Sequence, residues 1–410
     1  MIVMRTRRKV HWNVLAAALV VAAAGPARAQ SADDLFDPTR LHDVRLFINE
    51  RDLHELRVGY RENTYYPADL HWGDVRVRNI GIRSRGNGSR NPVKLGLHVE
   101  VDRYVAGQRL AGLAAIDLDN FWQDPSMIRE YAAMALFARM GQAAPRESFA
   151  RLFINGTYQG VYAIVEPVDS SFLTRVMGEP GGFLFEYRWL DRYELTDLGS
   201  DLAAVEARFE RRTHRTSPPA TAYAPLVEML RAVNAVDDGR WRETIERYVD
   251  LPQFLTHVAI EQFLSELDGL TGYDGVNNFY LYRPAGSSRH QFLPWDRDNA
   301  FQDARSPLFH RAEGIMLLRR AFAIPELRAE YLALLERCAE LAARDRWLEG
   351  VIVAAAALVA EAAAADPLKP YDAGAQSDAV QHLVDFARSR PAFVRQSIAD
   401  ARAARSRGRR

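Results

Sequence analysis

Two short stretches in the middle of the chain concentrate acidic and amide side chains. The stretches are LDGLTGYDGVNNFYLYR and FLPWDRDNAF, and their oxygen-bearing residues are Asp268, Asp274, Asn277, Asn278, Asp296 and Asp298. Carboxylate and amide oxygens are the ligands that Mg²⁺ and Mn²⁺ prefer in proteins. Asp and Asn also form turns without any ligand. The spacing therefore indicates a candidate metal centre and leaves a simple pair of turns as the alternative.

One lysine is a candidate ligand for phosphate. Only three of the 53 Lys and Arg residues are lysine, and one of them, Lys94, follows the stretch RGNGSRNPV. Metal-assisted phosphoryl transfer needs a cation on the nucleotide phosphates and a carboxylate that orients the acceptor hydroxyl. A compact ammonium meets phosphate differently from the planar guanidinium of arginine. Lys94 is therefore expected to bind phosphate, although a lysine retained on a strand by chance would look the same.

The elements that must position these residues change from strands to helices along the chain. Alternating apolar residues predict strands over most of 43–120, and Asn155-Gly156 predicts a hairpin. Helices are expected over 124–141 and over 250–269, the second directly before the first acidic stretch. From Gly314 onward the pattern is helical. The expected fold class is α+β, with a β-rich N-terminal half and a helical C-terminal half in two lobes.

The overall composition is that of a globular protein without a nucleic-acid partner. The formal net charge is zero and the isoelectric point is about 7.2, whereas a nucleic-acid-binding domain needs a basic surface. The chain has no zinc-ligand spacing, no P-loop and no serine-hydrolase motif. Its single cysteine, Cys338, lies in an apolar helical pattern and is expected in the core. Residues 195–245 are polar and predict no clear element.

The first 29 residues have the layout of a secretory signal peptide. A basic start is followed by the apolar run NVLAAALVVAAAG and by small residues before Gln30, so cleavage is expected after Ala29. This predicts a secreted, periplasmic or extracellular protein with no stable membrane insertion after cleavage. Residues 30–42 are expected to be a linker, and 401–410 a disordered basic tail.

Five separated segments, in this order, resemble the CotH kinase family, which has an atypical protein-kinase-like fold. They are IRSRGNGSRNPVKLGL, DLDNFWQDPSMIREYAAMALFARMG, RLFINGTYQGVYAIVEPVD, LDGLTGYDGVNNFYLYR and FLPWDRDNAF, and the resemblance covers roughly 43–301. It implies a kinase-like domain over 43–400. The match departs from ordinary kinases because the chain has no HRD catalytic loop and no Gly-rich lid.

The resemblance implies a role for each candidate residue. Lys94 would contact the nucleotide phosphates, and Arg85 and Asn87 would shape the loop before it. Glu166 would pair with Lys94 or help to hold the nucleotide. Asp268 would be the catalytic carboxylate, with Asp274 as the alternative. The metal ligands would be Asp296, Asp298 and either Asn277 or Asn278.

The function implied by the resemblance is an exported protein kinase that uses ATP with Mg²⁺ or Mn²⁺. Its partner would be a surface or secreted protein that is phosphorylated on Ser or Thr. A non-catalytic coat scaffold or adhesin that kept the fold is one alternative. Another is a different metal-dependent phosphoryl enzyme, such as a nucleotidyl transferase.

Overall fold

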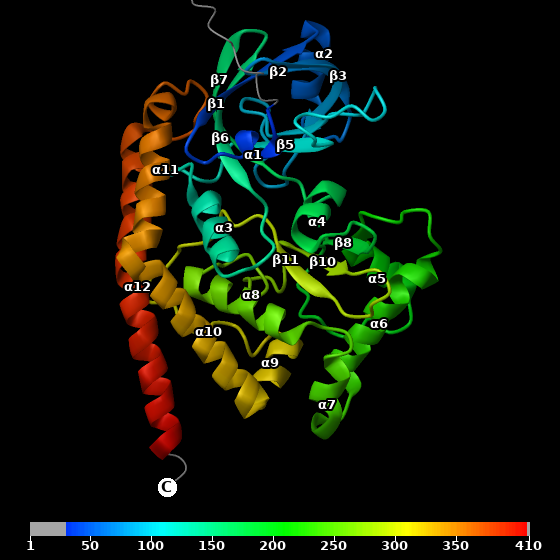
Figure 1. The fold of residues 1–410 in the computed structure, drawn as a ribbon, viewed down its shortest axis with the longest axis vertical. Helices are drawn as coiled ribbons and strands as arrows, with labels where there is room; N and C mark the ends of the chain where they lie inside the picture. The colour runs from blue at the N-terminus through cyan, green and yellow to red at the C-terminus, as the bar shows by residue number, and fades with distance from the viewer. Residues whose placement is uncertain (1–29, 408–410) are drawn as a thin grey trace, which may run out of the picture.

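The computed structural model describes residues 30–407 and has two lobes. Figure 1 shows a β-rich lobe at the top and a helical lobe below it. Each lobe has its own main hydrophobic core, and a third, smaller apolar cluster lies around the second sheet. The expected α+β class, with strands first and helices later, is confirmed.

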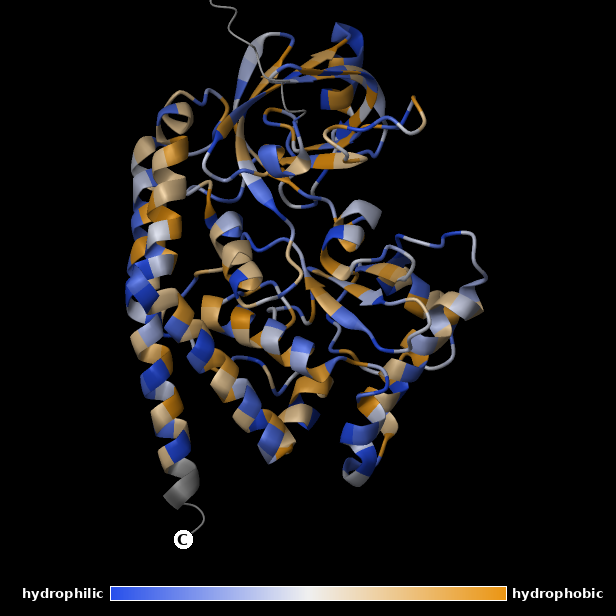
Figure 2. Ribbon diagram, viewed as in Figure 1, coloured by the Kyte–Doolittle hydropathy of each residue, from blue (hydrophilic) through white to orange (hydrophobic). Residues whose placement is uncertain are grey.

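The β-rich lobe is a closed barrel in the strand order β1-β2-β3-β4-β5-β7-β6. Strand β1 pairs parallel with β6, and the other neighbours pair antiparallel. Strands β1, β2 and β4 alternate between buried and less buried residues, because one face of each lines the barrel core, whereas β5, β6 and β7 are largely buried on both faces; Figure 2 shows the hydropathy of these strands. The strands are β1 (Leu41–Ile48), β2 (Tyr66–Trp72), β3 (Val75–Ser84), β4 (Leu97–Glu100), β5 (Ala115–Asp119), β6 (Glu147–Ile154) and β7 (Thr157–Val165).

The N-terminal residues of the described chain belong to the barrel. The short helix α1 (Ala32–Leu35) places Leu35 and Phe36 in the barrel core, and β1 begins at Leu41. The expected linker over 30–42 is therefore wrong, since a helix and the start of β1 lie within it and Leu35, Phe36 and His42 are buried. A second helix, α2 (Glu50–Val58), connects β1 to β2. The expected signal peptide, residues 1–29, lies outside the described residues.

The helical lobe is built around α8 (Leu251–Leu264), whose side chains are buried on almost all sides. Asp250 caps this helix as expected, because its carboxylate accepts a hydrogen bond from the backbone N–H of Gln253. A four-stranded sheet in the order β11-β10-β8-β9 lies beside α8. Its strands are β8 (Phe183–Tyr187), β9 (Phe209–Arg211), β10 (Phe279–Arg283) and β11 (Gln291–Pro294).

Several elements differ from the sequence prediction. Helix α3 (Arg129–Arg139) begins later than expected, because Asp124 accepts hydrogen bonds from the backbone N–H groups of Ser126, Ile128 and Arg129 in a preceding turn. The polar region 195–245 folds largely into helices. Its helices are α5 (Leu202–Arg208), α6 (Pro219–Ala235) and α7 (Asp238–Ile245), and α4 (Ser170–Met177) lies before this region, between β7 and β8.

Four helices form the C-terminal part of the described chain, and the last two of them run along one side of both lobes (Figure 1). They are α9 (Met316–Ala323), α10 (Pro325–Ala343), α11 (Trp347–Ala364) and α12 (Ala373–Arg407), with a short 3-10 turn η1 (Arg344–Arg346) between α10 and α11. Within the described chain, Pro325–Ala364 is long and apolar enough to cross a membrane by length and composition alone, but it kinks at Asp345 and packs partly on α12. Cys338 is buried in α10, as expected. Residues 401–407 continue α12, so they are not the disordered tail that the sequence suggested.

Candidate functional site

The loop after α8 holds one carboxylate between two amides. Asp268 lies four residues beyond the helix, and its two oxygens accept hydrogen bonds from Asn277 and Asn278, each at 3.0 Å. The backbone N–H of Asp268 donates to Glu266 at 2.7 Å. Burial raises the pKa of Asp268, while the two amides oppose that rise. Since both amide nitrogens face Asp268, the expected cluster of Asp268 and the Asn pair is present.

The alternative carboxylate, Asp274, lies at the edge of this loop. Asp274 is exposed, and its backbone carbonyl accepts a hydrogen bond from the indole N–H of Trp189. Gly275 follows with a φ of +88°, and its backbone bridges to Tyr193. The position of Asp274 is that of an exposed turn residue, which distinguishes it from Asp268, whose half-buried carboxylate is held by two amides.

Asp296 and Asp298 follow β11 on a loop that is fixed to α8. Between them, Arg297 is fully buried and lies 2.7 Å from the carboxylate of Glu261 in α8. Burial raises the pKa of Asp296 to about 6, while nearby Arg85 opposes this rise. Burial and the neighbouring Asp296 carboxylate raise the pKa of Asp298 well above its usual value. The loop therefore presents two carboxylates that would gain from a cation.

The opposite wall of this acidic region comes from the barrel. Arg85, at the end of β3, lies 3.0 Å from Asp119 and 3.5 Å from Asp117, both in β5. Burial alone would lower the pKa of Arg85, but these two carboxylates raise it above its usual value. The Arg85 guanidinium also lies 5.8 Å from the ring centroid of Trp295, the residue before Asp296, so the arginine lies between the two lobes. Asn87 is exposed in the loop that follows.

The donor set fits a hard divalent ion, although its members are not gathered around one point. Among the residues that the structure describes, no three acidic, histidine or cysteine side chains already stand within reach of a single metal ion. The fit rests on the chemistry of the donors. Burial raises the pKa values of Asp268, Asp296 and Asp298, and the side chains of Asn277 and Asn278 lie beside Asp268, so carboxylates and amides of the kind that bind Mg²⁺ are close together.

Lys94 lies in the loop between β3 and β4, and its ammonium is paired outside the acidic region. Its side chain is fully buried, and its ammonium is 2.7 Å from the carboxylate of Asp366, in the turn between α11 and α12. The ammonium also lies 5.2 Å from the ring centroid of Tyr162. Burial lowers the pKa of Lys94, and Asp366 opposes that change. The expected pairing of Lys94 with Glu166 is therefore wrong.

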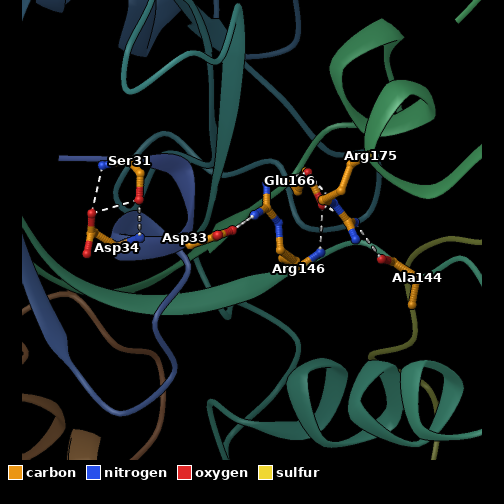
Figure 3. A network of polar contacts seen from close by, with 7 residues as sticks. All are labelled: Ser31, Asp33, Asp34, Ala144, Arg146, Glu166 and Arg175. Atoms are coloured by element: carbon orange, nitrogen blue, oxygen red, sulfur yellow. Dashed lines mark hydrogen bonds and ion pairs between the residues drawn. The ribbon is translucent and has the colours of Figure 1, made fainter. Parts of the chain in front are cut away.

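Glu166 is held by two arginines where β7 leads into the helical lobe. Figure 3 shows its carboxylate between Arg146 and Arg175. The distance to Arg146 is 2.8 Å, and Arg175 contacts both carboxylate oxygens. Arg146 also reaches Asp33 near the start of the described chain, and Arg175 donates to the carbonyl of Ala144. The role of Glu166 in nucleotide binding stays a prediction. In this structure the negative charge of Glu166 is paired with Arg146 and Arg175.

Several residues of the acidic region were missed by sequence reasoning. These are Asp117, Asp119, Glu130, Glu147 and Arg297. The alternation in AAIDLDN could have identified the two aspartates, because both stand on the polar face of an otherwise apolar strand. Glu147 lies outside the five segments that resemble the family. Glu130 lies within one of them but stands in the first turn of a helix, where an acidic residue is ordinary, so neither glutamate gave a signal of its own.

Comparisons with known proteins place both acidic stretches inside one family match. A family model described as CotH kinase protein matches residues 82–394. Inner spore coat protein H of Bacillus subtilis is 23% identical over 365 residues, which cover 86% of this chain and 96% of that protein. Spore coat protein homolog 1 of Rhizopus delemar is 20% identical over 254 residues, covering 59% of this chain and 39% of that protein. A crystal structure of the Helicobacter pylori proinflammatory kinase CtkA aligns with 78% of this chain and 94% of its own, at 9% identity and a TM-score of 0.29.

Proposed function

Because the chain belongs to the CotH kinase family, we propose that it is a metal-dependent atypical protein kinase that transfers phosphate from ATP to a Ser or Thr hydroxyl. The observation that carries this proposal is the half-buried Asp268, held by Asn277 and Asn278 in the same acidic region as Asp296. A carboxylate fixed in this way can orient an acceptor hydroxyl beside a metal-bound phosphate.

The metal ligands in this proposal are Asp296 and Asp298, with the amide oxygens of Asn277 and Asn278. A bound Mg²⁺ or Mn²⁺ would supply charge stabilisation for the transferring phosphoryl group. Asp268 would accept a hydrogen bond from the acceptor hydroxyl and align it. Arg297 positions Asp296 and Asp298 through its buried contact with Glu261.

The cation that meets the phosphates is Arg85 in this proposal, and no longer Lys94. The guanidinium of Arg85 lies between Asp119 and the loop that contains Asp296. The ammonium of Lys94 is buried and is paired with Asp366. A guanidinium can bind two phosphate oxygens at once. Asn87 lies exposed two residues later and is available to the same ligand.

The acceptor is proposed to be a surface, coat or secreted protein. Two observations support this: the signal-peptide layout of residues 1–29, and relatives that are named as spore coat proteins. The proposed location is therefore outside the cytoplasm, without a stable membrane insertion and without a nucleic-acid partner.

Incubation of the protein with labelled ATP and Mn²⁺ or Mg²⁺ tests the proposal. Metal-dependent self-phosphorylation on Ser or Thr is the expected result, and mass analysis of the product should find added phosphate. Added AMP would identify a nucleotidyl transferase. Binding of neither nucleotide nor metal by a folded protein would favour the non-catalytic scaffold.

A further inference from the structure

Glu147 has two buried carboxylate oxygens that meet no hydrogen-bond donor. The residue begins β6, only 5% of it is exposed, and neither oxygen has a partner in the described part of the chain. An unpaired buried carboxylate is among the most unfavourable groups that a fold can enclose. The proposed kinase mechanism does not use this side chain.

The strand register shows which way Glu147 points. Glu147 lies opposite Val165 in β7, and Val165 lies opposite Asp117 in β5, so the three side chains share one face of the sheet. Ile116 and Ile164, on the other face, belong to the barrel core, whereas Val165 belongs to the core of the helical lobe. Glu147 is therefore on the outer face of the barrel, toward the helical lobe.

A second glutamate approaches the same place from α3. Glu130 is the second residue of that helix, and its carboxylate accepts a hydrogen bond of 3.3 Å from the backbone N–H of Arg297. It therefore lies against the loop that contains Asp296. Burial raises the pKa of both Glu130 and Glu147 well above the usual value, and the nearby Glu147 carboxylate raises the pKa of Glu130 further.

The charges around this pair are unbalanced. The acidic groups that act on Glu147 are Asp119 and Asp296, and the basic group that opposes them is Arg85. Arg85 already contacts Asp117 and Asp119. One guanidinium, which is already paired, thus faces several carboxylates in a buried region. This excess of negative charge favours the binding of a divalent cation.

We propose that Glu147 and Glu130 form a further divalent-cation site between the two lobes, next to Asp296. The hard carboxylate oxygens select Mg²⁺ or Mn²⁺. Only the assignment of Asp296 rests on the proposed function. Because these side chains are not gathered around one point in the described residues, binding is expected to draw Glu147 and Glu130 together. The ion would join the barrel to α3 and to the acidic loop.

Manganese titration without nucleotide tests the site, with free Mn²⁺ followed by electron paramagnetic resonance on the full chain. Glu147→Gln keeps the size of the side chain and removes its charge. It should lose one class of Mn²⁺ sites or weaken it at least 10-fold, and Glu130→Gln should do the same. The matched control is Glu55→Gln, in the exposed part of α2, which should bind as the parent does.

Titration curves of Glu147→Gln that superimpose on those of the parent would overturn the proposal. A higher melting temperature of this variant with unchanged Mn²⁺ binding would also overturn it, because the carboxyl would then be held neutral by a proton. Phosphate transfer is measured in parallel on the parent. If the parent binds Mn²⁺ through Glu147 but transfers no phosphate, the cation site is supported and the proposed kinase function is refuted. If the parent transfers phosphate and Glu147→Gln binds Mn²⁺ as the parent does, the kinase function is supported and the cation site is refuted.

Discussion

The ammonium of Lys94 lies 2.7 Å from the carboxylate of Asp366, a residue 272 positions later in the chain, and both side chains are fully enclosed. Asp366 also accepts a hydrogen bond from the backbone N–H of Val161 at 3.0 Å. The carboxylate fits because position 160 is glycine, where a Cβ would lie 2.2 Å from Asp366. Figure 1 shows this turn between α11 and α12 beside the barrel. The ion pair therefore fastens the C-terminal helices to the β-rich lobe.

Asp366→Asn is expected to destabilise the protein by about 3–5 kcal/mol, because it leaves the buried Lys94 without a counter-ion. Urea unfolding of parent and variant measures this difference. The matched control is Asp378→Asn in α12, which is exposed and should stay within about 0.5 kcal/mol of the parent. The double variant Lys94→Met with Asp366→Leu should recover much of the loss. An Asp366→Asn variant as stable as the control would show that the pair contributes little.

Lys94→Arg separates a structural role from phosphate binding. The larger guanidinium does not fit the enclosed place of the ammonium, so the melting temperature should fall, while the folded protein should bind ATP within about twofold of the parent. Calorimetric titration at a temperature where the variant is folded measures the affinity. Unchanged stability with a loss of ATP affinity of 10-fold or more would restore Lys94 as a phosphate ligand.

Asp268→Asn should abolish transfer without abolishing binding. If Asp268 aligns the acceptor hydroxyl, the variant should fold, bind ATP with metal nearly as the parent does, and phosphorylate itself about 10²- to 10⁴-fold more slowly. Asp274→Asn is the control within the same loop, since Asp274 is exposed at a turn, and it should retain most activity. An inactive Asp274 variant beside an active Asp268 variant would reverse the assignment.

Asp296→Asn and Asp298→Asn should weaken metal-dependent ATP binding, because each removes an anionic ligand while the size of the side chain barely changes. Titration of ATP with and without Mg²⁺ measures the effect. The expected loss is at least 10-fold in the presence of Mg²⁺ and small in its absence. A loss in only one variant would assign the ion to that carboxylate, and no loss in either would remove this loop from the metal centre.

The local parts of the site could be read from the sequence because their signals are local. The Asn155-Gly156 turn, the Asp250 cap and the helix that ends before Asp268 each depend on a few adjacent residues. Asp268, Asn277 and Asn278 also lie within one loop, so their contacts join residues that are close in the sequence.

The contacts that join distant segments could not be read in this way. Lys94 looked like a phosphate ligand because its partner, Asp366, is remote in sequence and sits in a turn without any motif. Glu147 carries no local signal because its burial results from the packing of the barrel against the helical lobe. The helices within 195–245 were missed although the apolar residues of α6, such as Tyr223, Leu226 and Leu230, recur at helical spacing, because the segments on either side of them are polar.

The pH dependence of stability gives a last prediction, which concerns Glu266. This residue is buried, burial raises its pKa to about 8, and one carboxylate oxygen accepts from the backbone N–H of Asp268 while the other has no partner in the described residues. The folded state therefore holds a proton that the unfolded state releases near pH 4.5. The stability contributed by this proton is fully present below pH 4.5 and is lost as the pH rises to about 8.

The variant Glu266→Gln tests this, because its side chain keeps an oxygen that can accept from the backbone N–H of Asp268 and cannot ionise. Relative to the parent, its melting temperature should therefore rise by roughly 2–5 °C between pH 5 and pH 8.5. Glu340→Gln, on the exposed side of α10, is the control and should follow the parent at every pH. Melting curves measured across this range by circular dichroism decide the matter, and parallel pH profiles for Glu266→Gln and the parent would mean that Glu266 is not protonated in the fold.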